Sequence, residues 1–415
     1  MKRKVFTQYE TFVIAIITIV QFTVVLDFMV LSPLGAILIP ELSITPAQFG
    51  MVVSAYAFSA GASGLIAAGF ADKFDRKKLL LFFYGGFIIG TTMCALAPDY
   101  NNLLIARIIT GLFGGVMSSV SLAIITDVFK LEVRGRVMGY VQMAFASSQV
   151  LGIPIGLYFA ERIGWHFPFF MIVAISLAVA ALIIIFMKPI TTHLESPLGI
   201  NAFQHLIKTI SQSSYLRGFA ATVLLATGGF MLMPFASPFS VNNLGISLKD
   251  QLPLLYMITG IFSMITGPLI GKFSDQIGKY RIFVIGSLIT MIVVPIYCNL
   301  GITPFWLVLV LNIIMFTGVS SRIISSSALL TAVPSPQDRG AFMSINSSVQ
   351  QVSGGIATFV AGLIVAEGSG GKLLHYDTLG YVVVGAMTIT IIMMYLIHLQ
   401  VEKGAQKKVA VQTQP

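Results

Sequence analysis

The amino-acid sequence predicts an all-α membrane protein of twelve transmembrane helices, arranged as two pseudo-symmetric six-helix bundles. Three observations support this prediction: long apolar stretches, the positions of the basic residues between them, and an internal repeat. Hydrophobic residues make up 56% of the 415 residues and charged residues only 10%, whereas about a quarter of the residues of a soluble domain are charged. The composition therefore excludes an ordinary soluble protein.

A transmembrane helix needs about 20 predominantly apolar residues. The basic N-terminus resembles the start of a secretory signal, but the apolar run after it is too long for a signal-peptide core and predicts a retained first helix. On this basis we expect spans at 11–38, 50–71, 79–98, 102–126, 138–160, 166–188, 216–241, 252–271, 282–299, 304–331, 341–365 and 378–399.

Basic residues alternate between the gaps. Twenty of the 25 Lys and Arg residues lie at the two ends of the chain and in every second gap. The other five are Arg162, Lys249 and Lys372 in the intervening gaps, and Arg107 and Arg322 inside spans. The positive-inside rule then places both termini in the cytoplasm of a multi-pass protein in the cell (inner) membrane. The net charge of +9 reflects this topology and attraction to lipid headgroups, not nucleic-acid binding.

The two halves of the chain repeat each other at an offset of 205 residues. Arg134-Gly135 aligns with Arg339-Gly340, and Ser32-Pro33 aligns with Ser237-Pro238. Two related bundles would bind a substrate between them near the bilayer midplane. The predicted domains are an N-terminal bundle, a cytoplasmic linker, a C-terminal bundle and a disordered cytoplasmic tail, at 1–188, 189–215, 216–400 and 401–415.

Two gaps carry related motifs. The gap after the second span contains Gly69, Asp72, Arg76, Lys77 and Lys78, and the gap after the eighth contains Gly271, Asp275, Gly278 and Lys279. These residues resemble a signature of the major facilitator superfamily, although Ala68 and Asp75 stand where that signature has glycines. The resemblance covers nearly the whole chain.

The resemblance implies that Asp72 and Asp275 each clasp the opposite bundle on the cytoplasmic side and stabilise an outward-facing state. The alternative is that each merely anchors a tight turn. We expect the basic residues after Asp72, namely Arg76, Lys77 and Lys78, to lie at the headgroups.

Two further motifs support the resemblance. Arg107, followed four residues later by Gly111, looks like the second signature of the superfamily, and Asn312 is the repeat partner of this arginine. Span five carries Gly152, Pro154 and Gly156, which resembles the drug and sugar efflux (drug:proton antiporter) branch. The alternative for the proline is a kink that serves packing alone.

Three ionisable residues lie well inside spans: Asp27, Arg107 and Arg322. Each charge costs about 2.5–3.5 kcal/mol near a helix centre, so each needs a partner, a cavity or a neutral form. We hypothesise that Asp27 couples proton flow to transport and that Arg107 modulates the pKa of Asp27. The alternatives are that Asp27 is a structural carboxylate and that Arg107 stabilises the bundle. A rise of about 1.5 Å per residue separates these two residues by roughly 10 Å along the axis. Tilt and a long arginine side chain can bridge this gap, but a tight pair is not expected by default.

Polar residues on helix faces indicate a central cavity. Arg322 either meets an anionic group of the substrate or bonds nearby serine hydroxyl and carbonyl groups. The other candidates line the cavity or serve as interhelical hydrogen-bond partners, and they are Tyr56, Gln142, Gln149, Asn312, Asn346 and Gln350.

We therefore predict a proton-coupled secondary transporter that exports a small organic compound by alternating access. The expected partners are that substrate, protons and membrane lipids, with no nucleic acid, and the protein is expected to be monomeric. No nucleotide-binding loop is present, and no cofactor and no metal are expected, because histidines lie outside the spans' centres and only two cysteines occur. The alternatives are an importer or exchanger of an anionic metabolite, and a non-transporting sensor or intramembrane enzyme.

Overall fold

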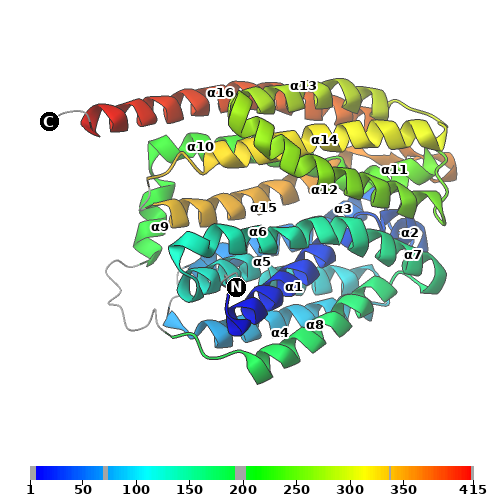
Figure 1. Ribbon diagram of the computed structural model, residues 1–415. Coiled ribbons are helices and arrows are strands. Elements are labelled where there is room, and N and C mark those ends of the chain that lie inside the picture. The colour runs from blue at the N-terminus through cyan, green and yellow to red at the C-terminus, as the bar shows by residue number, and fades with distance from the viewer. Residues whose placement is uncertain (1–5, 69–72, 192–201, 336–337, 413–415) are drawn as a thin grey trace, which may run out of the picture.

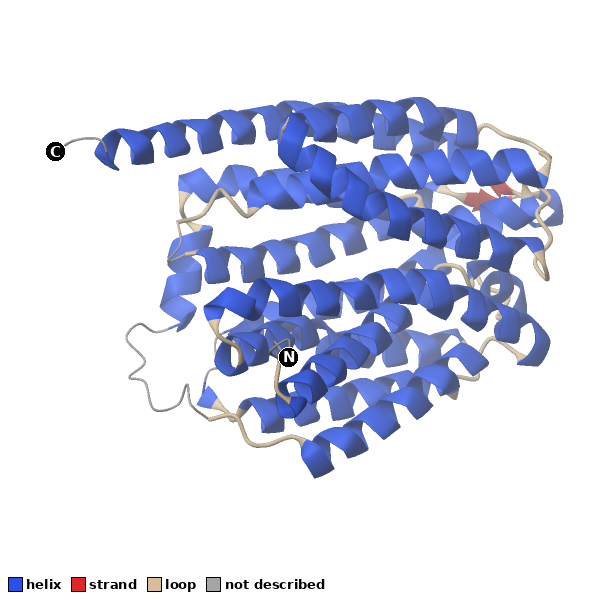
Figure 2. Cartoon of the chain, viewed as in Figure 1, coloured by secondary structure: helices blue, strands red, loops and turns tan. Residues whose placement is uncertain are grey.

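The computed structural model describes residues 6–68, 73–191, 202–335 and 338–412, and these residues are almost entirely helical (Figure 2). The first half of the chain contains α1 (Gln8–Val30), α2 (Gly35–Glu41), α3 (Pro46–Ala68), α4 (Arg76–Ala95), α5 (Tyr100–Val128), α6 (Leu131–Ser147), the π-helical turn η2 (Ser148–Gly152), α7 (Ile153–Ile163) and α8 (Phe167–Phe186). The second half contains α9 (Ala202–Ile210), α10 (Ser213–Phe230), the 3-10 turn η4 (Met233–Phe235), α11 (Ala236–Asn242), α12 (Gln251–Ile277), α13 (Lys279–Cys298), α14 (Phe305–Leu330), α15 (Arg339–Ile364), β1 (Ala366–Glu367), the 3-10 turn η5 (Ser369–Gly371), β2 (Leu373–Leu374) and α16 (Tyr376–Gln412).

The long helices run side by side in two groups (Figure 1). Helices α1 to α8 form one group, and α10 to α16 form the other. The groups meet chiefly where α3 packs along α15, and also where α12 contacts η2 and α7. We call the side on which α1 begins and α16 ends the terminal side, and the opposite side the far side.

Eleven segments of the described residues are long and apolar enough to cross a membrane. The predicted span that is not among these eleven is 341–365, which corresponds to α15. Its 26 residues give a length of about 39 Å, but polar residues such as Asn346 and Gln350 lower its hydropathy. Because α3 covers much of α15, protein replaces lipid along that face. The chain is therefore an all-α, multi-pass membrane protein of two related halves.

The first predicted span, 11–38, is wrong as a single helix. Helix α1 ends at Val30, and α2 begins only at Gly35. Pro33 lies in the break, where its ring and its missing N–H prevent the helix from continuing. The seventh predicted span, 216–241, is broken in the same way into α10, η4 and α11, so the repeat extends to the broken helices.

The fifth predicted span is also irregular, because the π-helical turn η2 separates α6 from α7. Single π-turns within α-helices widen the helix locally and frequently occur at functional sites. Pro154 follows this turn at the start of α7, where a proline costs no hydrogen bond within the first turn. The kink predicted for span five therefore begins before the proline.

The linker and the tail contain helix that the sequence analysis did not predict. Within the linker, α9 packs on α15, and Leu206 lies in a cluster with Tyr215, Phe219 and Phe342. The expectation of a disordered tail is wrong as far as Gln412, because α16 continues to that residue. Residues 192–201 of the linker lie outside the described residues.

Small residues allow close packing of α3 and α5 in the first half. A methyl group added at Gly111 would lie 2.1 Å from Ser59 Oγ and 2.4 Å from the Tyr56 carbonyl oxygen. A methyl group added at Gly85, in contrast, would meet no atom within 4 Å. Contact between α3 and α5 therefore depends on the absence of a side chain at Gly111.

We expect Gly111→Ala to destabilise the protein by about 1–3 kcal/mol, because the backbone of α3 must shift to admit the methyl group. Thermal unfolding of the purified protein in detergent would measure this effect. Gly85→Ala is the matched control and should leave the midpoint unchanged or slightly higher. Equal midpoints for the two variants would contradict the close packing.

Candidate functional site

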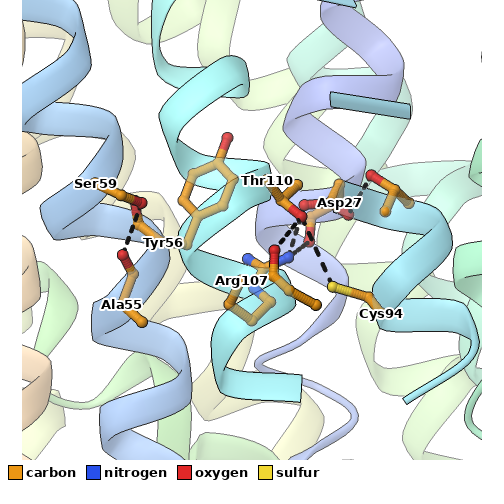
Figure 3. A network of polar contacts seen from close by, with 9 residues as sticks. Asp27, Ala55, Tyr56, Ser59, Cys94, Arg107 and Thr110 are labelled. Atoms are coloured by element: carbon orange, nitrogen blue, oxygen red, sulfur yellow. Dashed lines mark hydrogen bonds and ion pairs between the residues drawn. The ribbon is translucent and has the colours of Figure 1, made fainter. Parts of the chain in front are cut away.

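Asp27 and Arg107 form an ion pair in the interior of the first half. Arg107 Nη1 lies 2.7 Å from Asp27 Oδ2, and both side chains are 0% exposed. Figure 3 shows the two side chains pointing toward each other from α1 and α5. The structure therefore brings together the two residues predicted for proton coupling.

The prediction that these residues are not a tight pair is wrong, and the break in the first span explains why. Asp27 lies less than one turn from the end of α1 at Val30, not in the middle of a long helix ending at residue 38. Arg107 lies about two turns into α5, which begins at Tyr100. Both residues therefore sit at similar depths below the far side.

Four other side chains surround the ion pair. Thr91 Oγ1 donates a hydrogen bond of 3.3 Å to Asp27 Oδ1, and the Tyr56 ring lies 4.6 Å from the Arg107 guanidinium carbon. Cys94 Sγ lies 3.8 Å from Thr110 Oγ1 beside the pair. Arg107 Nε and Nη2 have no hydrogen-bond partner among the described residues. The arginine therefore depends on Asp27 for the compensation of its charge.

The predicted kink residues of span five pack directly against the residues that flank Asp27. A methyl group added at Gly152 would lie 2.5 Å from the Leu26 side chain, and one at Gly156 would lie 3.1 Å from the Val30 side chain. Small residues at this spacing let two membrane helices approach closely. The π-turn and α7 therefore cover the part of α1 that carries Asp27.

The motif after the second span acts differently from the prediction. Gly69 and Asp72 lie outside the described residues. Arg76 is only 4% exposed, and its Nε lies 2.9 Å from Asp127 Oδ2 of α5. Lys77 Nζ donates hydrogen bonds to the carbonyl oxygens of the last turn of α8 and of Met187. Arg76 and Lys77 therefore hold helix ends together, and their position at the headgroups stays a prediction.

Asp75 explains why the sequence departs from the signature at this position. Its carboxylate caps α4 by accepting a hydrogen bond of 2.9 Å from the Lys77 backbone N–H, and it accepts a second of 3.0 Å from the Ile190 N–H. A carboxylate at a helix N-terminus satisfies a backbone donor and interacts favourably with the helix dipole. The residue therefore links α4 to the chain that follows α8.

The corresponding motif in the second half forms a helix end. Gly278 adopts φ +111°, which favours glycine, and it separates α12 from α13, which begins at Lys279. A methyl group at Gly271 would meet no atom within 4 Å. Asp275 is exposed, and it makes no hydrogen bond or ion pair with the described residues of the other half. The clasp predicted for Asp275 is therefore not formed in this structure.

A different pair of contacts joins the two halves near the far side. Ser32 Oγ donates a hydrogen bond to the Met233 carbonyl oxygen, and Ser237 Oγ donates one of 2.6 Å to the Pro33 carbonyl oxygen. These serines are repeat partners, so each helix break bonds the other. We call these two reciprocal hydrogen bonds the serine clasp.

One ion pair reinforces this closure. Lys249 Nζ lies 3.5 Å from Glu161 Oε1, and it connects the loop before α12 to α7 of the other half. Aromatic contact between Phe49 and Phe235, with ring centroids 6.2 Å apart, fills the space beneath. Both halves therefore meet closely on the far side.

The predicted cavity residues divide between two places. Arg322, Asn346 and Gln350 line one cavity of about 270 Å³ in the second half. Tyr56 lies instead at the ion pair, and Gln149 belongs to the π-turn, which packs against Gly260 of α12.

Two predicted cavity residues lie elsewhere. Asn312 is buried and is not among the residues that line the cavity, and the side chain of Gln142 lies outside the described residues. The sequence analysis missed Thr222, which lines the cavity and bonds Asn346 Oδ1 at 2.5 Å. A lone threonine in an apolar helix gives no distinct signal in a sequence.

Known proteins share both the sequence pattern and the fold of this chain. A sequence model of the Major Facilitator Superfamily matches residues 17–294 and 218–414. The MFS-type transporter YceJ of Bacillus subtilis (strain 168) is 26% identical over 353 residues, which cover 83% of this chain and 87% of that protein. A bicyclomycin resistance protein homolog of Haemophilus influenzae is 24% identical over 329 residues, covering 76% of this chain and 80% of that protein. A solved D-xylose-proton symporter aligns with a TM-score of 0.74 at 18% identity, over 92% of this chain and 97% of that chain.

We expect Asp27→Asn and Arg107→Gln each to destabilise the protein by about 3–5 kcal/mol, because each leaves a buried charge without its partner. The double variant should recover part of this loss, since it removes both charges. Thermal unfolding in detergent would measure the three midpoints. The pair of Lys249 and Glu161 provides the control. Because Lys249 is exposed, disruption of this pair should cost about 1 kcal/mol or less. Strictly additive effects of the two buried substitutions would contradict the coupling.

We expect loss of the serine clasp to open the far side. The reporter is Thr358→Cys, a buried position at the contact of α15 with α3, in a background lacking Cys94 and Cys298. A membrane-impermeant maleimide applied from the far side would label this cysteine when that side opens. Two interhelical hydrogen bonds of about 1 kcal/mol each correspond to a rise in labelling rate of roughly tenfold or more for Ser32→Ala/Ser237→Ala.

Ser240→Ala is the matched control for this experiment. Ser240 is equally buried, but its hydroxyl bonds the Ala236 carbonyl oxygen and the Tyr297 hydroxyl within the second half. Its labelling rate should equal that of the background. An equal rate in the double variant would show that the clasp does not hold the far side closed.

Proposed function

The chain belongs to the major facilitator superfamily and is a membrane transporter rather than an enzyme, and we propose that it couples proton uptake to the export of a small organic compound. The observation that carries this proposal is the fully buried ion pair of Asp27 and Arg107. Intramembrane carboxylates of this kind typically belong to ion or proton pathways. The Haemophilus influenzae relative is named for bicyclomycin resistance, and export of a toxic compound is one way to become resistant to it, which supports the proposed direction.

Protonation would change the charge of this site. When Asp27 is ionised, the pair is neutral overall, because Arg107 remains protonated under all ordinary conditions. When a proton binds the Asp27 carboxylate, the site carries one uncompensated positive charge. A buried unpaired charge is strongly unfavourable, so the protonated site favours a conformation that admits water or another partner for Arg107.

Phe28 offers a route from this site to the second half. The Phe28 ring lies against Tyr56, with centroids 5.3 Å apart, and against Phe230 of α10, with centroids 6.0 Å apart. Tyr56 in turn stacks over Arg107. A change in the pairing of Asp27 would therefore alter contacts at the interface of the two halves.

Alternating access would exchange one set of contacts for another. With both termini in the cytoplasm of the cell (inner) membrane, as the basic residues predict, the serine clasp would close the outer side. The free Asp275 carboxylate on the terminal side matches an inward-facing state. In the outward-facing state the serine clasp would break, and Asp72 and Asp275 would contact the opposite halves.

A second candidate function is the import or exchange of an anionic metabolite. The specific observation in its favour is Arg322, a buried cation that lines the cavity without an acidic partner among the described residues. This candidate differs from the first in the charge of the substrate and in the need for a proton gradient. Uptake into proteoliposomes without a proton gradient would distinguish it.

We expect substrate binding to the purified transporter to release protons, and Asp27→Asn to abolish this release. The measurement uses weakly buffered detergent solution and a pH indicator, with a panel of drug-like cations, sugars and organic acids as ligands. Binding to the wild type without proton exchange would contradict proton coupling. Proton release that persists in Asp27→Asn would contradict the role of this carboxylate.

Asp99→Asn is the control for the loss of one carboxylate. Asp99 is exposed at the start of α5, and hydrogen bonds from the backbone and side chain of Asn102 hold its pKa below the ordinary value for aspartate. Asp99 therefore stays ionised as the pH falls from neutral until it approaches that lowered pKa. Asparagine also caps helices well, so this variant should release as many protons as the wild type.

A further inference from the structure

The cavity in the second half is built by three helices around Arg322. Helices α10, α14 and α15 supply all fifteen lining residues, and the cavity has a volume of about 270 Å³. Arg322 is the sole charged residue among those that line it. The cavity therefore presents one positive charge within an otherwise neutral wall.

The Arg322 guanidinium group has no polar partner among the described residues. Its side chain is 3% exposed, and neither Nε nor Nη2 makes a hydrogen bond. The nearest aromatic face is Phe283, whose ring centroid lies 5.9 Å from the guanidinium carbon. Gly228 of α10 lies beside the Arg322 guanidinium group, and a methyl group added there would lie 3.4 Å from Nη2.

The neighbouring serines do not satisfy the arginine. The Ser321 hydroxyl donates to the Thr317 carbonyl oxygen, and the Ser326 hydroxyl donates to the Ile323 carbonyl oxygen. The Ser325 hydroxyl lies 3.3 Å from the Ser274 hydroxyl. The alternative of a structural arginine bonded to its serine-rich surroundings is therefore not supported by these contacts.

Arg322 differs in this respect from Arg107. Both arginines are buried within the bundles, but Arg107 has Asp27 at 2.7 Å, whereas Arg322 has no such carboxylate within the described part of the chain. Arginine cannot lose its proton in a protein, so it cannot escape the cost of burial by becoming neutral. A guanidinium group with free donors on a cavity wall is suited to bind a carboxylate or phosphate through two parallel hydrogen bonds.

We propose that Arg322 is the anion-binding residue of this cavity, and that the cavity takes a small organic carboxylate. A water molecule occupies about 30 Å³ in the liquid, so the cavity has room for roughly nine non-hydrogen atoms. Leu225, Phe230 and Val319 offer apolar contact to the body of such a ligand, and Gln350 offers an amide. The ligand class is also the substrate class of the proposed transporter. Only this last step, from ligand to substrate, rests on the proposed function.

Binding can be tested without transport. Benzoate, with nine non-hydrogen atoms, and benzamide, its neutral counterpart of equal size, are the matched probes. The purified full-length protein in detergent should bind benzoate roughly tenfold or more tightly than benzamide, measured as the ligand-dependent rise of the unfolding midpoint. Succinate and phenyl phosphate extend the test to other anions that suit an arginine.

Variants assign the binding to Arg322. Arg322→Gln should abolish the preference for benzoate over benzamide, and Arg322→Lys should retain part of it, because lysine keeps the charge but not the planar fork. Without ligand, Arg322→Gln should unfold at the same or a higher temperature than the wild type, since it removes an unpaired buried charge. Arg217→Gln, at an exposed position of α10, should change neither property.

Three results would overturn the assignment. The first is equal binding of benzoate and benzamide together with no response to succinate or phenyl phosphate. The second is a benzoate preference that survives in Arg322→Gln. The third is a marked fall in the unfolding temperature of that variant without ligand. Proton exchange by the wild type on benzoate binding separates this proposal from proton coupling. Benzoate binding with no proton exchange in the wild type would sustain the anion site and contradict the proposed coupling.

Discussion

The absence of water from the bilayer core is the constraint on which the ion pair of Asp27 and Arg107 depends. A backbone or side-chain polar group at this depth must find its partner within the protein. The pair obtains this compensation across α1 and α5, and η2 and α7 pack against α1 beside it. The same constraint applies to Arg322, whose charge is buried without a carboxylate among the described residues. This unpaired charge lowers the stability of the transporter when no ligand is bound.

The repeat explains why the contacts between the halves occur in pairs. Each half breaks its first long helix, at Ser32-Pro33 in the first half and just before Ser237-Pro238 in the second. Each serine bonds the backbone at the other break. The ion chemistry does not follow the repeat, because Asn312 stands at the position that corresponds to Arg107. The first half therefore holds the charge pair, and the second half holds the cavity with the single cation.

Sequence reasoning identified the helical membrane fold, the repeat and the charged residues, because apolar length and charge placement are local properties of the chain. It misplaced Asp27 relative to Arg107, because periodicity alone did not reveal that the apolar run 11–38 is broken at Pro33. It also missed the serine clasp, since a hydrogen bond between residues about 200 positions apart leaves no local pattern. The ion pair of Arg76 with Asp127 was also missed, because Asp127 lies on another helix.

The polarity of α15 has a consequence for biogenesis. Recognition of a membrane segment during synthesis depends on its apolarity, and α15 falls short because of the polar face that it turns toward the cavity. Its stable place in the bilayer therefore depends on α3, which was synthesised about 290 residues earlier and must remain available. Insertion of α15 thus unites the two halves, and the second half depends on the first for its place in lipid.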